Sequence, residues 1–172
     1  YNFKKGKIYS LVGPSGSGKS TLLNIMSLID KPSSGEVAIK NKNINFTNLM
    51  LTDKIRSGSI GIIYQEKNLL SDFTALENVY LARLAIDNNK NKAIEDAKKI
   101  IKEMGLLNRI NHYPSELSGG ENQRIAIARA LINKPDIILA DEPTGSLDQK
   151  TAKEVFRILY KTKNTARLII YA

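Results

Sequence analysis

Hydrophobic positions along the chain follow two different spacings, which predict strands and helices in turn. Short apolar or alternating runs, typical of β-strands, occupy 7–12, 36–40, 59–64, 135–142 and 167–171. Apolar residues at helical spacing, typical of amphipathic helices, occupy 21–28, 74–86, 93–104, 121–132 and 150–160. Because strands and helices alternate at both ends of the chain, we expect an α/β fold with a mostly parallel sheet covered by helices.

The middle and the start of the chain depart from this alternation. Residues 74–113 carry only helical patterns, with Thr74 as the expected N-cap of one helix and Gly105 as the C-cap of the next. They predict an inserted helical subdomain. The alternating run at 36–40 is followed by turn residues at 41–43, so we also expect a small antiparallel β part near the N-terminus.

Composition limits the classes of protein. With 172 residues, 42% hydrophobic and 25% charged, the chain fits one soluble domain, which we place at 1–172. No apolar run approaches the roughly 18 residues of a membrane span. Tyr1 to Lys5 lead directly into the first strand without a signal peptide. The lack of cysteine excludes disulfides and thiolate chemistry.

The net charge of +9 admits two interpretations. One is a basic surface for nucleic acid or anionic lipid, and the other is a general preference for Lys and Asn along the chain. Lys is spread over the whole sequence, and no basic stripe interleaved with aromatic residues occurs. We therefore favour the second interpretation and expect no nucleic acid partner.

A glycine-rich segment between the first strand and the first helix carries the strongest chemical signal. It reads Gly13-Pro14-Ser15-Gly16-Ser17-Gly18-Lys19-Ser20 and fits the phosphate-loop pattern G-x-x-x-x-G-K-[ST] in its strand–loop–helix context. Glycines let backbone N–H groups turn toward an anion, and the following helix directs its positive dipole end there. Lys19 supplies a mobile positive charge and Ser20 a hydroxyl for Mg²⁺. With Thr21, the segment predicts binding of a nucleotide triphosphate.

Two carboxylates follow the buried strand at 135–142. Ligands of open α/β sheets bind at the carboxyl ends of the strands, where these acids stand. Adjacent residues on a strand point to opposite sides, so the acids can have different roles. We expect Asp141 to reach Mg²⁺ beside Ser20, and Glu142 to polarise a water that attacks the γ-phosphate.

A second anion-binding candidate is Leu117-Ser118-Gly119-Gly120-Glu121, which begins a helix. By itself the string is a capped helix start. In a chain that also has a phosphate loop, it predicts a second phosphate site built from backbone N–H groups and the helix dipole.

Together these motifs resemble the ABC-type ATPases, the nucleotide-binding subunits of ATP-binding cassette transporters, over nearly the whole chain. Residues 13–20 resemble the Walker A loop and 136–142 the Walker B strand. Gln65 resembles the Q-loop glutamine, which senses Mg²⁺ and the γ-phosphate. Residues 117–121 are similar to the signature motif, and 146–148, which end in Asp148, resemble the D-loop of the dimer interface.

The resemblance implies a mechanism. Two copies would pair head to tail, so that ATP and Mg²⁺ lie between the Walker A loop of one chain and the signature residues of the other. Closure and reopening would drive a transmembrane permease at the cytoplasmic face of the inner membrane, contacted by about 67–85. Lys19, Gln65 and Glu142 would be the catalytic residues.

Several stretches are most similar to the lipoprotein-releasing (Lol) ATPases, above all the run from Phe73 to Val79. That group also contains macrolide or antimicrobial-peptide exporters and cell-division ATPases that regulate cell-wall hydrolases, and both remain alternatives. A soluble ATPase of DNA repair or translation is disfavoured, since no coiled-coil or zinc insertion and no second cassette occurs. A nucleotide-binding module without catalysis is disfavoured by Glu142.

Two parts of the family pattern are not found. Tyr1 lies too close to Lys19 to match the aromatic residue that stacks on adenine, and no switch histidine follows the last strand. The one histidine, His112, precedes the signature motif, where a surface or interdomain role is expected. The chain thus resembles a core cut at both ends, and we expect it to bind ATP weakly and hydrolyse it slowly.

Overall fold

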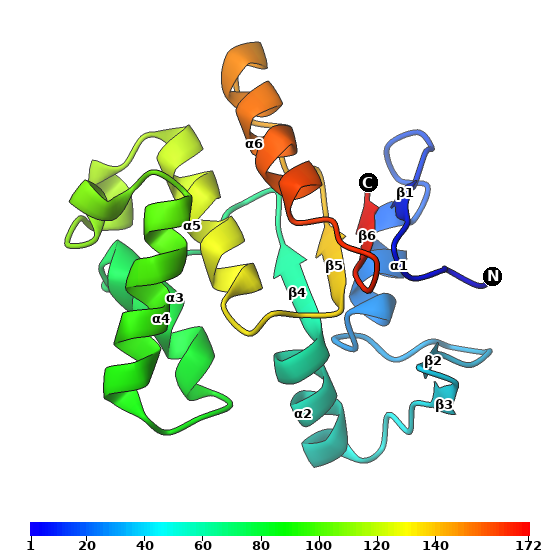
Figure 1. Ribbon diagram of the computed structural model, residues 1–172. Helices are drawn as coiled ribbons and strands as arrows, with labels where there is room; N and C mark the ends of the chain where they lie inside the picture. The colour runs from blue at the N-terminus through cyan, green and yellow to red at the C-terminus, as the bar shows by residue number, and fades with distance from the viewer.

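The computed structural model describes residues 1–172 and contains two sheets (Figure 1). Four parallel strands form the main sheet in the order β1-β6-β5-β4. Their bounds are β1 Ile8–Ser10, β4 Ile60–Ile63, β5 Ile137–Ala140 and β6 Leu168–Tyr171. The second sheet is an antiparallel ribbon of β2 Ala38–Ile39 and β3 Lys42–Asn43. The predicted α/β fold, with a parallel core and a small antiparallel part, is confirmed.

Six α-helices and two short 3-10 helices accompany the strands. They are α1 Lys19–Met26, α2 Leu49–Ser59, α3 Ala75–Leu84, α4 Lys90–Glu103, η1 Leu107–Arg109, η2 Pro114–Glu116, α5 Gly119–Leu131 and α6 Gln149–Lys161. None of them has the length and apolar character that a membrane crossing requires. Residues 74–113 contain α3, α4 and η1 and no strand. That these residues form an inserted subdomain remains a prediction.

Two local features differ from the sequence prediction. Helix α2 was not anticipated, because its first turn exposes Leu49 and Met50 and only Thr52 is buried, so no apolar stripe marks it. The turn of the ribbon lies at Lys40 and Asn41, whose φ angles are 53° and 61°, rather than at 41–43. The residues after Asn41 therefore form β3.

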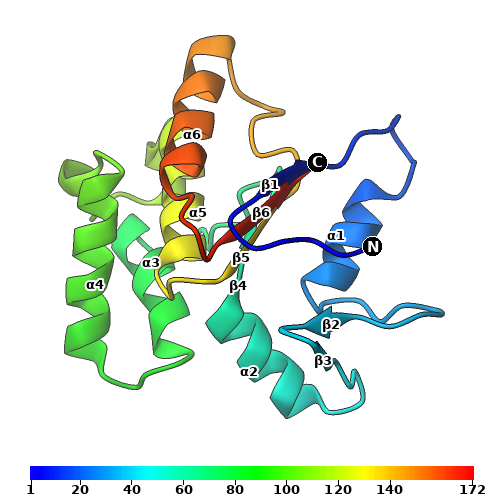
Figure 2. The same cartoon turned by 45° about the vertical axis from the view of Figure 1, so that its right-hand side comes forward.

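The main sheet separates two hydrophobic cores, because successive residues of a strand point to opposite faces. On one face, Ile63, Ile138 and Ile169 pack with α3, α4, α5 and α6. On the other face, Leu139 and Ile170 pack with α1 and the ribbon. Figures 1 and 2 show α5 and α1 on opposite sides of the sheet in both views. The chain segments before these two helices are therefore separated by the sheet.

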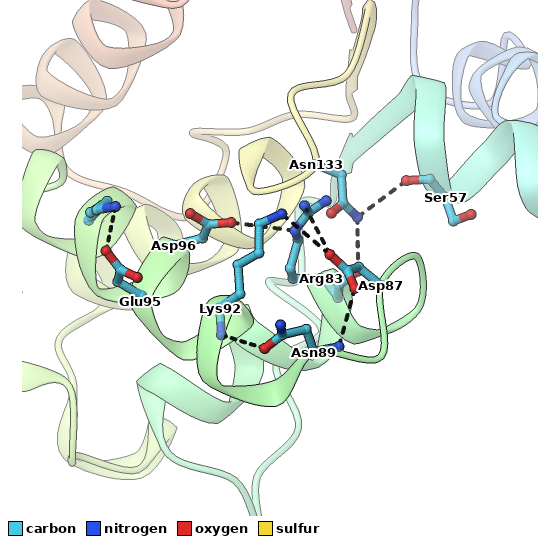
Figure 3. Close-up of polar contacts among 10 residues, drawn as sticks. Ser57, Arg83, Asp87, Asn89, Lys92, Glu95, Asp96 and Asn133 are labelled. Carbon is cyan, nitrogen blue, oxygen red and sulfur yellow. Dashed lines mark hydrogen bonds and ion pairs between the residues drawn. The ribbon is translucent and has the colours of Figure 1, made fainter.

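Polar contacts join the helices of the first face (Figure 3). Arg83 of α3 lies 3.5 Å from the carboxylate of Asp96 on α4 and 3.8 Å from that of Asp87. Asn133, just after α5, donates to the carbonyls of Ala82 (2.8 Å) and Ser57 (3.3 Å). These contacts tie α2, α3, α4 and the end of α5 together beside the edge strand β4.

Candidate functional site

The glycine-rich segment forms the turn between β1 and α1. Gly16 and Gly18 have φ angles of 78° and 87°, a left-handed conformation that glycine adopts without steric cost. The N–H groups of the first turn of a helix have no intrahelical partner. Here the N–H groups of Lys19, Ser20 and Thr21 bond to no other protein group. The turn therefore presents free backbone donors at the positive end of a helix, as predicted for a phosphate loop.

The side chain of Lys19 folds back over this turn. Its Nζ donates to the carbonyls of Gly13 (2.9 Å) and Pro14 (3.0 Å). The turn itself is tight, since the Ser17 N–H donates to Pro14 at 3.2 Å, and a Cβ on Gly13 would lie 2.6 Å from Ser17 Oγ. A side chain at position 13 would thus require the exposed Ser17 hydroxyl to rotate away, and the Lys19 ammonium lies against the backbone carbonyls that begin the turn.

The two acids lie at the carboxyl end of β5, next to the end of β4. The N–H of Asp141 donates to the carbonyl of Ile63 at 2.9 Å, which continues the pairing of the two strands. Because β4 and β5 are neighbours, the residues that follow them leave the sheet side by side. Strand β6 lies between β5 and β1, so β1, which leads into the phosphate loop, is two strand spacings, about 10 Å, from β5, which leads into the acids.

Gln65 and Glu142 converge on Gly145. A Cβ on this glycine would lie 3.2 Å from Gln65 Nε2 and 3.1 Å from Glu142 Oε2. Glu142 has a φ of 40°, which is unusual for a residue with a side chain. Sequence reasoning named Gln65 and Glu142 but missed Gly145, although a glycine three residues after two acids is a turn signal.

A cation at this edge of the sheet would have hard oxygen donors. No group of three His, Cys, Asp or Glu side chains is arranged to hold a metal. The hydroxyl of Ser20, the carboxylate of Asp141 and the amide oxygen of Gln65 are of the type that Mg²⁺ prefers. This sparse set fits an ion that is otherwise held by water and by phosphate oxygens.

The second predicted phosphate site begins α5. Ser118 is its N-cap, and its Oγ accepts from the Glu121 N–H at 3.2 Å while Glu121 Oε2 accepts from the Ser118 N–H at 2.8 Å. This capping box lowers the pKa of Glu121, chiefly through the Ser118 N–H and also through Arg109, 3.2 Å away. The Glu121 carboxylate thus bonds within its own helix start, and the exposed Ser118 and Gly119 lie at the surface.

Asp148 also caps a helix. Its carboxylate accepts from the N–H groups of Lys150 (3.0 Å) and Thr151 (3.1 Å) at the start of α6. The pKa of Asp148 is lowered, chiefly by the Thr151 side chain and then by these backbone bonds. Just before it, Ser146 Oγ accepts from Lys67 Nζ at 2.7 Å. The predicted D-loop is therefore fixed to α6 at one end and to the segment after Gln65 at the other.

The two predicted phosphate sites do not meet within one chain. The phosphate loop begins α1, on one face of the sheet, and Ser118 begins α5, on the other face. Tyr1 is 99% exposed, and its ring is tilted against that of Phe3 and edge-on to that of Tyr9, with ring centroids 4.8 and 6.3 Å away. His112 lies among the helices, 3.2 Å from the Arg109 guanidinium.

Comparisons with known proteins agree with this geometry. A family model described as "ABC transporter" matches residues 1–145. The lipoprotein-releasing system ATP-binding protein LolD of Rickettsia bellii is 51% identical over 98% of this chain and 76% of its own length. LolD of Shewanella oneidensis is 48% identical over 93% of this chain and 70% of its own. The dimeric ATP-binding cassette MJ0796 bound to ADP and Pi is similar over 100% of this chain and 77% of its own, with a TM-score of 0.89 and 41% identity.

Proposed function

Because the chain belongs to the ABC transporter family, as an ATP-binding subunit, we propose that it hydrolyses ATP to power lipoprotein release from the inner membrane. The lipoprotein substrate is supported by the names of relatives about half identical to this chain. Hydrolysis is supported by the convergence of Gln65 and Glu142 on Gly145, beside the end of β5. In this proposal the chain lies at the cytoplasmic face of the membrane, attached to a transmembrane permease.

The binding residues divide between the phosphate loop and the sheet edge. Residues 13–21 hold the phosphates through free N–H groups, and Lys19 exchanges its two carbonyl partners for phosphate oxygens. Ser20, Asp141 and Gln65 would hold Mg²⁺, directly or through water, and the ion would supply positive charge to the phosphate oxygens. Glu142 accepts the proton of the attacking water.

The remaining site residues act across a dimer. Ser118, Gly119 and Gly120 of one copy cover the phosphates bound by the other, while Asp148 and Glu121 hold the two helix starts in shape for that contact. This arrangement is supported by the position of the two phosphate sites on opposite faces of one sheet. The similarity to a dimeric cassette supports it as well.

We further infer two finer properties. Residues 74–113 form a helical subdomain, supported by the Arg83–Asp96 pair that joins α3 to α4. His112 contacts the Arg109 guanidinium among the helices rather than the site, so it takes no part in hydrolysis. Replacement of His112 by Asn should then leave the hydrolysis rate unchanged, and a loss of the rate would contradict this placement.

The direct test of hydrolysis is Glu142→Gln. The variant keeps the phosphate loop but removes the proton acceptor, so we expect ATP to bind and to hold the dimer closed while phosphate release stops. Glu103→Gln, the same change at an exposed position on α4, is the matched control and should hydrolyse ATP at the parent rate. Undiminished hydrolysis by Glu142→Gln would refute the assignment of Glu142.

A further inference from the structure

Arg129 of α5 is bound to backbone carbonyls in a different part of the chain. Its guanidinium donates to the carbonyl of Asn68 at 2.6 Å and to that of Lys67 at 2.9 Å. No carboxylate lies within ion-pair distance of it. Burial lowers the pKa of Arg129, an effect that the nearby Tyr64 partly offsets. A half-buried guanidinium without an anionic partner is costly, and the two carbonyls are what satisfy it.

Both carbonyls belong to the irregular segment that follows Gln65. The segment has no helix or strand between the end of β4 and the start of α3, and Asn68 has a φ of 45°. Its far end is held by Asn78 of α3, which bonds to the Leu70 N–H (2.7 Å) and carbonyl (3.0 Å). Its near end, next to Gln65, is held by Arg129 and by the Lys67–Ser146 bond.

We propose that Arg129 is a positioning residue that keeps Gln65 in place beside Glu142. This inference rests on the proposed function, in which Gln65 contacts Mg²⁺ and the attacking water. Gln65 is exposed and its side chain bonds to no other side chain or backbone group, so its position depends on the backbone on either side, which is held by β4 before it and by the contacts of the segment after it. Without the guanidinium, two carbonyls lose their partner and the backbone next to Gln65 is free to move.

The same contact connects α5 to the site. This helix carries Ser118 as its N-cap and Arg129 in its last turn, so one rigid element touches both the dimer-facing surface and the Gln65 segment. Through Lys67, the segment also contacts Ser146, two residues before Asp148. A shift of α5 on dimer closure would therefore move the backbone that positions Gln65. Coupling of this kind requires mutational evidence rather than proximity alone.

The test is a double-mutant cycle measured by steady-state ATP hydrolysis over a range of Mg²⁺ concentrations. Arg129→Gln should lower kcat between about 10-fold and 100-fold, the loss expected when a reacting group is misplaced by about 1 Å. The KM for ATP should stay unchanged, because the phosphate loop is intact, and the half-saturating Mg²⁺ concentration should rise. In a Gln65→Ala background, the Arg129 change should lower kcat further by less than about twofold, since it acts through Gln65.

Arg167 provides a matched control. It too is half-buried and donates to two carbonyls, those of Pro135 (2.9 Å) and Thr162 (2.8 Å), but it lies before β6, at the opposite end of the sheet from the site. Arg167→Gln should lower the free energy of unfolding and leave the Mg²⁺ dependence of hydrolysis unchanged. Equal Mg²⁺ profiles for Arg129→Gln and the parent would overturn the inference while leaving the proposed function intact.

Two further outcomes are decisive. Arg129→Lys keeps a cation but loses the planar fork that donates to both carbonyls, so its kcat should lie between those of Arg129→Gln and the parent, and it serves as the measured variant if Arg129→Gln folds poorly. A Lys variant as impaired as the Gln variant would overturn the inference. Full activity of Gln65→Ala alone would instead overturn both the inference and the assignment of Gln65 in the proposed function.

Discussion

Two adjacent glycines at the start of α5 have different surroundings. A Cβ on Gly119 would meet only Leu147 Cδ2, at an ordinary contact distance of 3.6 Å. A Cβ on Gly120 would overlap Cγ2 of Thr151 on α6. Neither glycine has a positive φ, so the requirement at position 120 is one of space alone. The signature segment therefore touches α6 through a glycine that leaves no room for a side chain.

We predict that Gly120→Ala lowers the free energy of unfolding by about 1–3 kcal/mol, as overpacking does elsewhere. Gly119→Ala should leave it unchanged or raise it slightly, because alanine favours the helix. Urea unfolding of both variants measures the difference. Thr151→Ala removes the overlapping methyl group and should recover most of the loss in a double variant. A double variant no more stable than Gly120→Ala would show that another contact is responsible.

At the scale of elements, some helices can be located from neighbouring residues in the sequence, whereas other features leave no local signal. The capping box of α3, in which Thr74 Oγ accepts from the Glu77 N–H and Glu77 accepts from the Thr74 N–H, lies within four residues. Helix starts of this kind are encoded locally, so sequence analysis located them. Helix α2 was missed because its apolar residues are exposed and do not follow a helical spacing. The ribbon turn was misplaced because the positive φ angles of Lys40 and Asn41 cannot be recognised from residue type as those of glycine can.

The same division holds for the candidate site. The phosphate loop is one continuous string, and Gln65 and Glu142 could be found from their places after strands. The contacts of Arg129 and Lys67 join residues 61 to 79 positions apart, so no local pattern predicts them. A single charge in an otherwise apolar stretch of α5 was the one signal for Arg129.

Helix α3 offers a pH-dependent test of its cap. The pKa of Glu77 is lowered in the folded protein, chiefly by the Thr74 N–H and then by the Thr74 hydroxyl. Its contribution to stability is thus complete above the unfolded-state pKa and is lost as the pH falls through the lower folded-state pKa. Thr74→Ala should cost about 1 kcal/mol of unfolding free energy near neutral pH.

The difference between the parent and Thr74→Ala should shrink in acid, where the protonated, uncharged Glu77 accepts the hydroxyl only weakly. Urea unfolding at neutral pH and at a pH below the folded-state pKa of Glu77 measures this change. Ser71→Ala, an exposed hydroxyl deletion in the preceding loop, should have little effect at either pH. A pH-independent difference for Thr74→Ala would mean that the Glu77 carboxylate is not part of the cap.

At the scale of the whole molecule, the sheet keeps the two phosphate sites of one chain apart. The loop at 13–20 lies with α1 on the face of the smaller core, and Ser118 lies with α5 on the face of the larger one. In the proposed function, a complete site needs two copies related by a twofold axis, each supplying one half. This geometry makes the two halves separable by mutation.

We predict that Lys19→Ala and Ser118→Arg complement each other. Each variant alone forms dimers with two defective sites, whereas a mixed dimer has one intact site. In an equal mixture, random pairing should restore about a quarter of the parent hydrolysis rate at the same total protein concentration. A mixture no more active than the average of its two components would show that each site is built within one chain.

The unequal size of the two cores has a consequence for local unfolding. Eighteen buried residues hold the helical face, and six hold the face that carries α1 and the ribbon. Regions with fewer buried contacts open more readily than the rest of a protein. We expect amide hydrogens of α1 to exchange with solvent faster than those of α5, and ATP at a hundred times its Kd to protect α1 by up to about 2.7 kcal/mol. On this expectation the phosphate loop is attached to the less stable half of the molecule, and bound nucleotide would stabilise that half.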